Sequence, residues 1–196
     1  MNSLIKVTNL NKTFYFQKKK LNILRNINID IKEGEMVALL GPSGSGKSTF
    51  LHMIGLLDKP TSGQIYFQEK ITNKMSENEK DQIRRKNISI IYQQNNLLND
   101  FTSLENVSIA MISANQNKKL SITKSTKILN KVGLNSRLEH LPSDLSGGEQ
   151  QRVAIARAFV NEPNLILAEE PTGSLDQKTA KEIFSLFLKL KSKKRT

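Results

Sequence analysis

GPSGSGKST, residues 41–49, is the most informative segment of this chain, because it fits the pattern of a phosphate-binding loop. Glycines at this spacing let backbone N–H groups turn toward phosphate oxygens, where a side chain would clash. The apolar run 36–40 precedes the loop and the helix-forming run 50–54 follows it, which is the strand–loop–helix context that a phosphate loop requires. Lys47 can reach the β- and γ-phosphates of a nucleotide, and the Ser48 hydroxyl can bind Mg²⁺. The predicted phosphate-binding residues are Gly41, Ser43, Gly44, Ser45, Gly46, Lys47, Ser48 and Thr49.

The composition narrows the class of protein. A chain of 196 residues is long enough for one domain with a sizeable core. The sequence contains no cysteine, which excludes disulfides and thiolate metal sites, and no apolar run approaches the ~18 residues of a spanning helix. The first residues lack the shape of a signal peptide, so we expect a cytosolic protein that meets a membrane only through a partner.

The net charge of +12 admits two interpretations. A basic protein can attract nucleic acid or an anionic membrane surface. Here most lysines are scattered, and aromatic residues do not alternate with them as a single-strand binding platform would require. The charge is better explained by solvated surface lysines, and no specific nucleic acid partner is expected.

The remaining patterns predict an α/β fold. Strands are expected at 4–8, 24–31, 36–40, 65–67, 88–92 and 165–167, with a turn at 9–12 and an exposed hairpin tip at 18–20. The run Met36–Leu40 is apolar throughout, so its strand is expected to be covered on both faces. Helices are expected at 76–86, 104–112, 122–132 and 176–191. Because strand signals stop between 97 and 160, we predict a helical insertion there within the α/β core.

The aromatic cluster Phe14, Tyr15 and Phe16 follows the first strand. One of these rings could stack on an adenine. Alternatively, all three could pack in the sheet, and the residues alone leave both interpretations open.

A second informative stretch is LSGGEQQR, residues 145–152. Ser146 and Glu149 fit the capping box S-x-x-E, which begins a helix. Gly147 and Gly148 in the first turn cost helix stability, about 1 kcal/mol each relative to Ala. Bare backbone at a helix N-terminus suits a second anion site, although an ordinary glycine-containing cap remains the alternative.

A third stretch is the apolar run 165–167, which ends in Glu169 and Glu170. Adjacent residues point to opposite sides of a strand, so the two carboxylates can take two roles. One can bind Mg²⁺ and the other can orient an attacking water. Without the phosphate loop, an ordinary exposed strand end would be the simpler interpretation.

In their order along the chain, these motifs resemble the nucleotide-binding subunit of an ABC transporter, from about residue 4 to 196. The resemblance implies a single domain over 1–196 with a P-loop NTPase core and a mainly parallel sheet. It also implies an N-terminal antiparallel β subdomain and a helical insertion, about 97–160, that carries the signature motif. The implied nucleotide is ATP, bound with Mg²⁺.

The resemblance also assigns roles to individual residues. Phe14 takes the adenine-stacking position, and Asp176 lies in the loop that crosses the dimer interface. Ser146, Gly147, Gly148 and Glu149 cover the γ-phosphate. The implied catalytic residues are Glu170, Lys47 and Gln93, and the implied Mg²⁺ ligands are Ser48, Gln93 and Glu169. Gln93 also couples to the membrane subunit.

The implied partners are a second copy of the chain and integral membrane permease subunits. The two copies form a head-to-tail dimer with ATP between them, peripheral on the inner face of the cytoplasmic membrane. The stretches 51–63 and 91–107 are similar to the lipoprotein-releasing branch. The alternatives are a macrolide- or peptide-exporting system, the cell-division ATPase, an ABC ATPase acting on nucleic acid, and a nucleotide-binding regulator that no longer hydrolyses ATP.

Two departures from the family pattern affect the expected activity. Glu169 stands where the family usually has Asp, and its extra methylene could disturb the water shell of Mg²⁺. The sequence given ends at Thr196, before a further core strand and a histidine that the resemblance implies; neither His52 nor His140 matches that histidine. We therefore expect a truncated chain of low stability with little ATPase activity.

Overall fold

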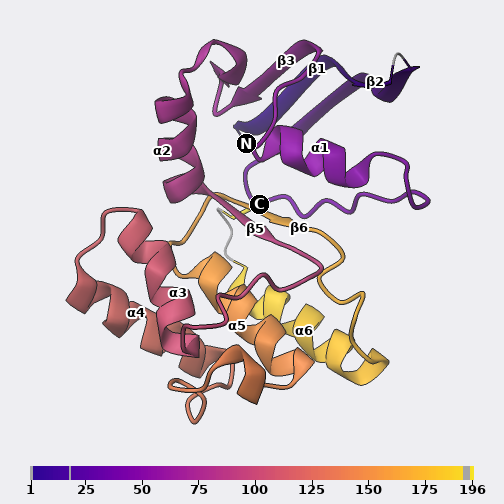
Figure 1. The fold of residues 1–196 in the computed structure, drawn as a ribbon. Coiled ribbons are helices and arrows are strands. Elements are labelled where there is room, and N and C mark those ends of the chain that lie inside the picture. The colour runs from indigo at the N-terminus through magenta and orange to yellow at the C-terminus, as the bar shows by residue number, and fades with distance from the viewer. Residues whose placement is uncertain (1, 18, 192–194) are drawn as a thin grey trace. The chain divides into compact units, whose positions relative to one another are not determined.

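The computed structural model describes residues 2–17, 19–191 and 195–196. The chain divides into two compact units, residues 1–84 with 193–196, and residues 85–192. Figure 1 shows the order of the helices and strands along the chain. Lys18, which the sequence placed in a hairpin tip, lies outside the described residues.

The first unit contains a four-stranded antiparallel sheet in the order β2-β1-β3-β4. Its strands are β1 (Ser3–Phe16), β2 (Lys19–Lys32), β3 (Ser62–Phe67) and β4 (Lys70–Ile71). The prediction of a turn at 9–12 is wrong, because these residues lie within β1. Asn9 has a φ of 49° and the pairing with β2 shifts register between Val7 and Leu10, as at a β-bulge, so the segment is irregular but stays within the strand.

Two helices and a 3₁₀ turn complete the first unit: α1 (Lys47–Ile54), η1 (Thr72–Lys74) and α2 (Glu77–Asn87), which continues to the start of the second unit. The core is formed by the inward-facing side chains of the strands with the apolar side of α1: Leu4, Ile5, Val7, Leu10, Ile65, Met53 and Ile54. Gly63 allows β3 to approach β1 closely, because a Cβ at this residue would lie 2.3 Å from the Asn9 carbonyl oxygen.

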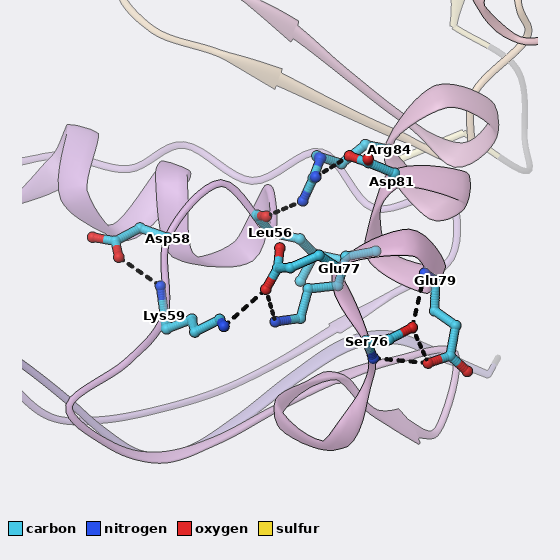
Figure 2. A network of polar contacts seen from close by, with 9 residues as sticks. Leu56, Asp58, Lys59, Ser76, Glu77, Glu79, Asp81 and Arg84 are labelled. Carbon is cyan, nitrogen blue, oxygen red and sulfur yellow. Dashed lines mark hydrogen bonds and ion pairs between the residues drawn. The ribbon is translucent and has the colours of Figure 1, made fainter.

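A polar network joins the end of α1 to the start of α2 (Figure 2). Lys59 Nζ lies 2.8 Å from Glu77 Oε1, and the Lys59 backbone N–H donates to Asp58. Arg84 donates to the Leu56 carbonyl and pairs with Asp81. These contacts connect the segment after α1 to the α2 helix within the first unit.

The expected strand Met36–Leu40 is absent, which corrects the sequence prediction. Residues 35–42 form neither helix nor strand, and Leu40 is 88% exposed. A strand needs a neighbouring edge for its N–H and C=O groups. Among the described residues, neither sheet includes 36–40, so the apolar run has no ladder to join.

The second unit contains a parallel pair, β5 (Ile88–Ile91) and β6 (Leu165–Ala168), in register from Ile88–Leu165 to Ile91–Ala168. Its helices are α3 (Ser103–Ser113), α4 (Lys118–Lys131), α5 (Gly147–Phe159) and α6 (Gln177–Leu190), with the 3₁₀ turn η2 (Pro142–Asp144). Helix α5 packs against β5, α3, α4 and α6 in the middle of this unit (Figure 1). The shared core includes Val107, Leu129, Val153, Ile155 and Ile183.

The helices expected from the sequence at 76–86, 104–112, 122–132 and 176–191 are confirmed with small shifts of their ends. The described residues between β5 and β6 contain no strand, as the pattern at 97–160 predicted. The parallel sheet of the described residues has two strands, fewer than the sequence suggested, because 36–40 does not join it.

Candidate active site

The phosphate loop 41–49 leads into α1 in the first unit. Helix α1 begins without a side-chain cap, its N-cap Gly46 has a φ of 94°, and its first turn contains no acidic residue. Gly44 also has a left-handed φ, 77°, which favours glycine. Lys47 Nζ lies 2.8 Å from the Gly41 carbonyl oxygen and 2.9 Å from that of Pro42, so the ammonium lies across the loop. The loop therefore combines a positive helix end with a positive side chain, which suits a phosphate.

The β1–β2 hairpin packs directly against this loop. A Cβ at Gly46 would lie 2.9 Å from Ile23 Cγ2 and 3.1 Å from Leu24 Cδ2, so only glycine fits this contact without displacement. The same hairpin carries Phe14, opposite Leu21 in the register. In the first unit, Phe14 thus lies on the same antiparallel pair of strands that packs against the phosphate loop at the start of α1.

Phe14 does not pack in the sheet core. Its side chain is 41% exposed, and Tyr15 and Phe16 are more exposed still. Lys12 Nζ lies 4.8 Å from the centroid of the Phe14 ring and also 2.6 Å from Asp58 Oδ2. The interpretation in which all three rings are buried in the sheet is therefore wrong, and the stacking of Phe14 on an adenine stays a prediction.

In the second unit, the capping box at the start of α5 is confirmed. Glu149 N–H donates to Ser146 Oγ at 3.3 Å, and Glu149 Oε2 accepts from Ser146 N–H at 2.9 Å and from Ser146 Oγ at 2.8 Å. The backbone and side-chain bonds from Ser146 and the bond from Arg137 lower the pKa of Glu149 to about 2. The carboxylate at this helix tip therefore stays ionised at lower pH than an ordinary glutamate.

The two glycines after Ser146 have different surroundings. A Cβ at Gly148 would lie 2.9 Å from Thr179 Cγ2 of helix α6, whereas a Cβ at Gly147 would meet only Leu175 Cδ2, at 3.9 Å. Close packing against α6 thus gives a structural reason for Gly148. Gly147 has no such reason, and Ser146 and Gly147 are exposed.

The two carboxylates follow β6, as the sequence predicted. Glu169 N–H extends the parallel ladder by donating to the Ile91 carbonyl at 2.8 Å, and Glu170 then turns with a φ of 41°. Left-handed backbone at a non-glycine residue is uncommon and occurs often at functional sites. Glu170 Oε2 and Gln93 Nε2 both lie beside Gly173, 3.2 and 3.4 Å from where its Cβ would be. The second unit therefore brings Gln93 and Glu170 to one place.

Sequence reasoning missed Arg157, which holds the segment after Gln93. Its Nη1 donates to the Asn96 carbonyl at 2.8 Å and its Nη2 to the Asn95 carbonyl at 2.7 Å. Burial lowers the pKa of the Arg157 guanidinium. The contact spans 62 residues of sequence, and no local pattern pointed to it.

The sequence also missed Arg137, whose Nε donates to Glu149 Oε1 at 2.9 Å. Twelve residues separate the two, and Arg137 lies in a turn with no motif of its own. Because Arg137 lies outside the stretch 145–152, that motif gave no indication of the contact.

The predicted site residues thus form two groups. Phe14 and residues 41–49 lie in the first unit, whereas Gln93, 146–149, Glu169 and Glu170 lie in the second. Asp176 is the N-cap of α6 and accepts from the backbone N–H groups of Lys178 and Thr179. None of the helices in the described parts of the chain has the length and hydrophobicity of a membrane span.

Comparison with known proteins identifies the family. Residues 24–173 match the family described as ABC transporter. The lipoprotein-releasing system ATP-binding protein LolD of Rickettsia felis is 45% identical over 195 residues, covering 100% of this chain and 86% of that protein. LolD of Wigglesworthia glossinidia brevipalpis is 44% identical over 193 residues, covering 98% and 84% of the two chains.

A solved structure is also similar. The dimeric structure of MJ0796, a bacterial ABC transporter cassette, has a TM-score of 0.88 and 43% sequence identity, covering 95% of this chain and 82% of that one. The chain described here belongs to the ABC transporter family. The predicted resemblance and fold class are confirmed, as is the expectation of a transporter ATPase subunit.

Proposed function

We propose that this chain is the ATP-binding and ATP-hydrolysing subunit of a system that releases lipoproteins from the inner membrane. The observation that carries the proposal is its 45% identity, over the full length of the chain, to a relative named for lipoprotein release. The phosphate loop with Lys47 and the capped helix tip at Ser146 support the nucleotide part of the proposal.

Each ATP would lie between two copies of the chain. In one copy, the loop 41–49 holds the phosphates, with Lys47 beside the β- and γ-phosphates and Phe14 against the adenine. In the other copy, the exposed tip Ser146–Glu149 covers the γ-phosphate. One chain carries one loop and one tip, so a head-to-tail pair completes two sites.

Hydrolysis requires an oriented water and stabilisation of the charge on the transferred phosphate. Glu170 is suited to orient the water, since it is exposed at the end of β6 with Gln93 nearby. Lys47 would offset the developing charge. The opening of the dimer after hydrolysis would then move the membrane partner, with Gln93 at the contact.

The residues assigned to Mg²⁺ fit the ion in their chemistry. Mg²⁺ prefers oxygen ligands and takes several of them from phosphates and water. Ser48, Gln93 and Glu169 supply a hydroxyl, an amide oxygen and a carboxylate. When bound, the ion would neutralise charge on the phosphates.

The partners would be permease subunits that span the cytoplasmic membrane. The chain itself would sit peripherally on the cytoplasmic face, attached through those subunits.

The test is ATP turnover of the purified chain alone and reconstituted with its permease in lipid vesicles carrying a lipoprotein. We expect a low turnover by the chain alone, a higher turnover with the permease, and release of the lipoprotein on addition of ATP. Glu170→Gln should abolish turnover, whereas Glu139→Gln, which removes an exposed carboxylate from another turn, should not. Turnover without any lipoprotein release would leave the ATPase intact and contradict the proposed cargo.

Glu169 gives a second prediction about the same reaction. Its carboxylate is one methylene longer than the family's usual Asp, so we expect Glu169→Asp to raise the ATP turnover several-fold. Turnover measured at saturating Mg²⁺ and ATP checks this. An unchanged or lower rate would show that the longer side chain does not limit the reaction.

A further inference from the structure

The N-terminal tip of α5 carries a negative charge at the place where the proposed dimer would bring the γ-phosphate. Glu149 lies in the first turn, and its Oε2 is fixed by the two bonds from Ser146, at 2.9 and 2.8 Å. Like any glutamate with an ordinary or lowered pKa, Glu149 is ionised at neutral pH. An uncompensated carboxylate would repel a phosphate that approaches the same helix end.

Arg137 provides the compensating charge. Its Nε donates to Glu149 Oε1 at 2.9 Å, on the oxygen that the capping box does not use. The side chains of Arg137 and Glu149 are 40% and 28% exposed, so the pair lies at the surface beside the tip. Arg137 Nη1 also lies 3.5 Å from His140 Nε2.

The turn that carries Arg137 is itself held in place. Arg137 N–H donates to the Leu134 carbonyl at 3.0 Å, and the Arg137 carbonyl accepts from His140 N–H at 3.2 Å. The His140 carbonyl in turn accepts from Ser103 N–H, at the start of α3, at 2.9 Å. The guanidinium is thus presented to Glu149 by a backbone anchored to another helix of the unit.

We propose that Arg137 is a positioning and charge-compensating residue that makes the Ser146–Glu149 tip able to receive the γ-phosphate held by a second copy of the chain. This inference rests on the proposed ATP-bound dimer. Arg137 acts through Glu149 and does not contact the nucleotide. Its effect on dimer formation therefore depends on the charge of Glu149.

A double-mutant cycle tests this dependence. Arg137→Gln, Glu149→Gln and the double variant are each combined with Glu170→Gln to prevent turnover, and the dimer dissociation constant is measured with ATP by analytical ultracentrifugation. We expect Arg137→Gln to weaken the dimer about fivefold to tenfold when Glu149 is present, and less than about twofold in the Glu149→Gln background. The glutamine can still accept the capping-box bonds, so the helix start is retained.

Arg152→Gln is the matched control. Arg152 lies on α5, as Glu149 does, but pairs with Glu182 at 2.8 Å. Arg152→Gln therefore removes one positive charge from an ion pair that does not include the α5 capping box. It should change the dimer less than twofold. Weakening by Arg152→Gln equal to that by Arg137→Gln would overturn the proposal, because net charge alone would explain both.

The remaining outcomes are also decisive. An equal loss from Arg137→Gln with and without Glu149 would overturn the proposal, since Arg137 would then act on the fold; thermal unfolding of the same variants would show that change. Dimer formation unaffected by Arg137→Gln would overturn it as well. If the protein with only Glu170→Gln binds ATP but forms no dimer, the proposed function fails, and the inference fails with it.

Discussion

Helices α1 and α5 both begin at glycine-rich loops, but their first turns are built in opposite ways. Helix α1 begins at Gly46 with no side-chain cap and no acidic residue, and its first residue is Lys47. Helix α5 begins with a complete capping box between Ser146 and Glu149. The N-terminus of α1 therefore offers positive charge directly. At the N-terminus of α5, the Glu149 carboxylate caps the helix itself and is paired with Arg137.

The difference suggests which half of a shared nucleotide site can act by itself. A loop with an ammonium across it can hold a phosphate within one chain. A capped tip with a paired carboxylate contributes weaker attraction, and is better suited to complete a site than to begin one. Three experiments test this difference between the two helix ends, and the one with the largest expected effect comes first.

The largest effect is expected at the uncapped end. Lys47→Ala removes the only basic side chain of the loop, so the affinity of the chain for ATP should fall about 10- to 100-fold, as for the loss of hydrogen bonds to charged groups. Calorimetry with ATP measures this, and Lys124→Ala, an exposed lysine on α4, is the control. Equal affinities for the protein and its Lys47→Ala variant would remove the basis of the comparison and of the proposed function.

A smaller effect separates the two glycines of the α5 tip. Gly148→Ala places a methyl group 2.9 Å from Thr179 Cγ2, so it should destabilise the fold by about 1–3 kcal/mol. Gly147→Ala meets no such contact and gains helix propensity, so it should leave stability unchanged or raise it by up to about 1 kcal/mol. Urea unfolding of the two variants gives the comparison. Equal free energies of unfolding would contradict the packing argument.

The smallest effect is the pH dependence of the α5 cap. The pKa of Glu149 in the folded chain, about 2, lies below its ordinary value of 4.5. A depressed carboxyl pKa contributes stability above the ordinary value, and that stability is lost as pH falls through the folded value. Between pH 4.5 and 2 the loss should be about 1 kcal/mol, because solvent screens this partly exposed group.

Glu149→Gln provides the reference for that measurement. The difference in free energy of unfolding between the protein and the variant should shrink as the pH falls through this range. A constant difference would mean that ionisation of Glu149 does not stabilise the cap. Helix α1 has no acidic residue in its first turn and should contribute no such dependence.

Local patterns predicted those features that depend on residues a few positions apart. The bonds of the α5 capping box join Ser146 to Glu149, three residues on, and Asp176 caps α6 through Lys178 and Thr179. The helices and most strands were found for the same reason, since their hydrophobic periods repeat within a few residues. The family resemblance rested on motifs of this kind.

The failures concern contacts between distant residues. Met36–Leu40 has the composition of a buried strand, but a strand forms only where another edge is available to pair with it. The turn predicted at 9–12 is a bulge in β1, because the pairing with β2 extends beyond it. Arg157 reaches carbonyls more than 60 residues away, which no window of sequence displays.

The order of residues is enough to predict that a phosphate loop leads into one helix and a capped, glycine-rich tip leads into another. These features follow from backbone conformation and from hydrogen bonds between near neighbours. The folded chain was needed to show that Gly148 packs closely against Thr179, that Gln93 and Glu170 lie beside Gly173, and that Arg137 pairs with Glu149. Such contacts arise when packing brings separate segments together, so their partners cannot be identified before the chain is folded.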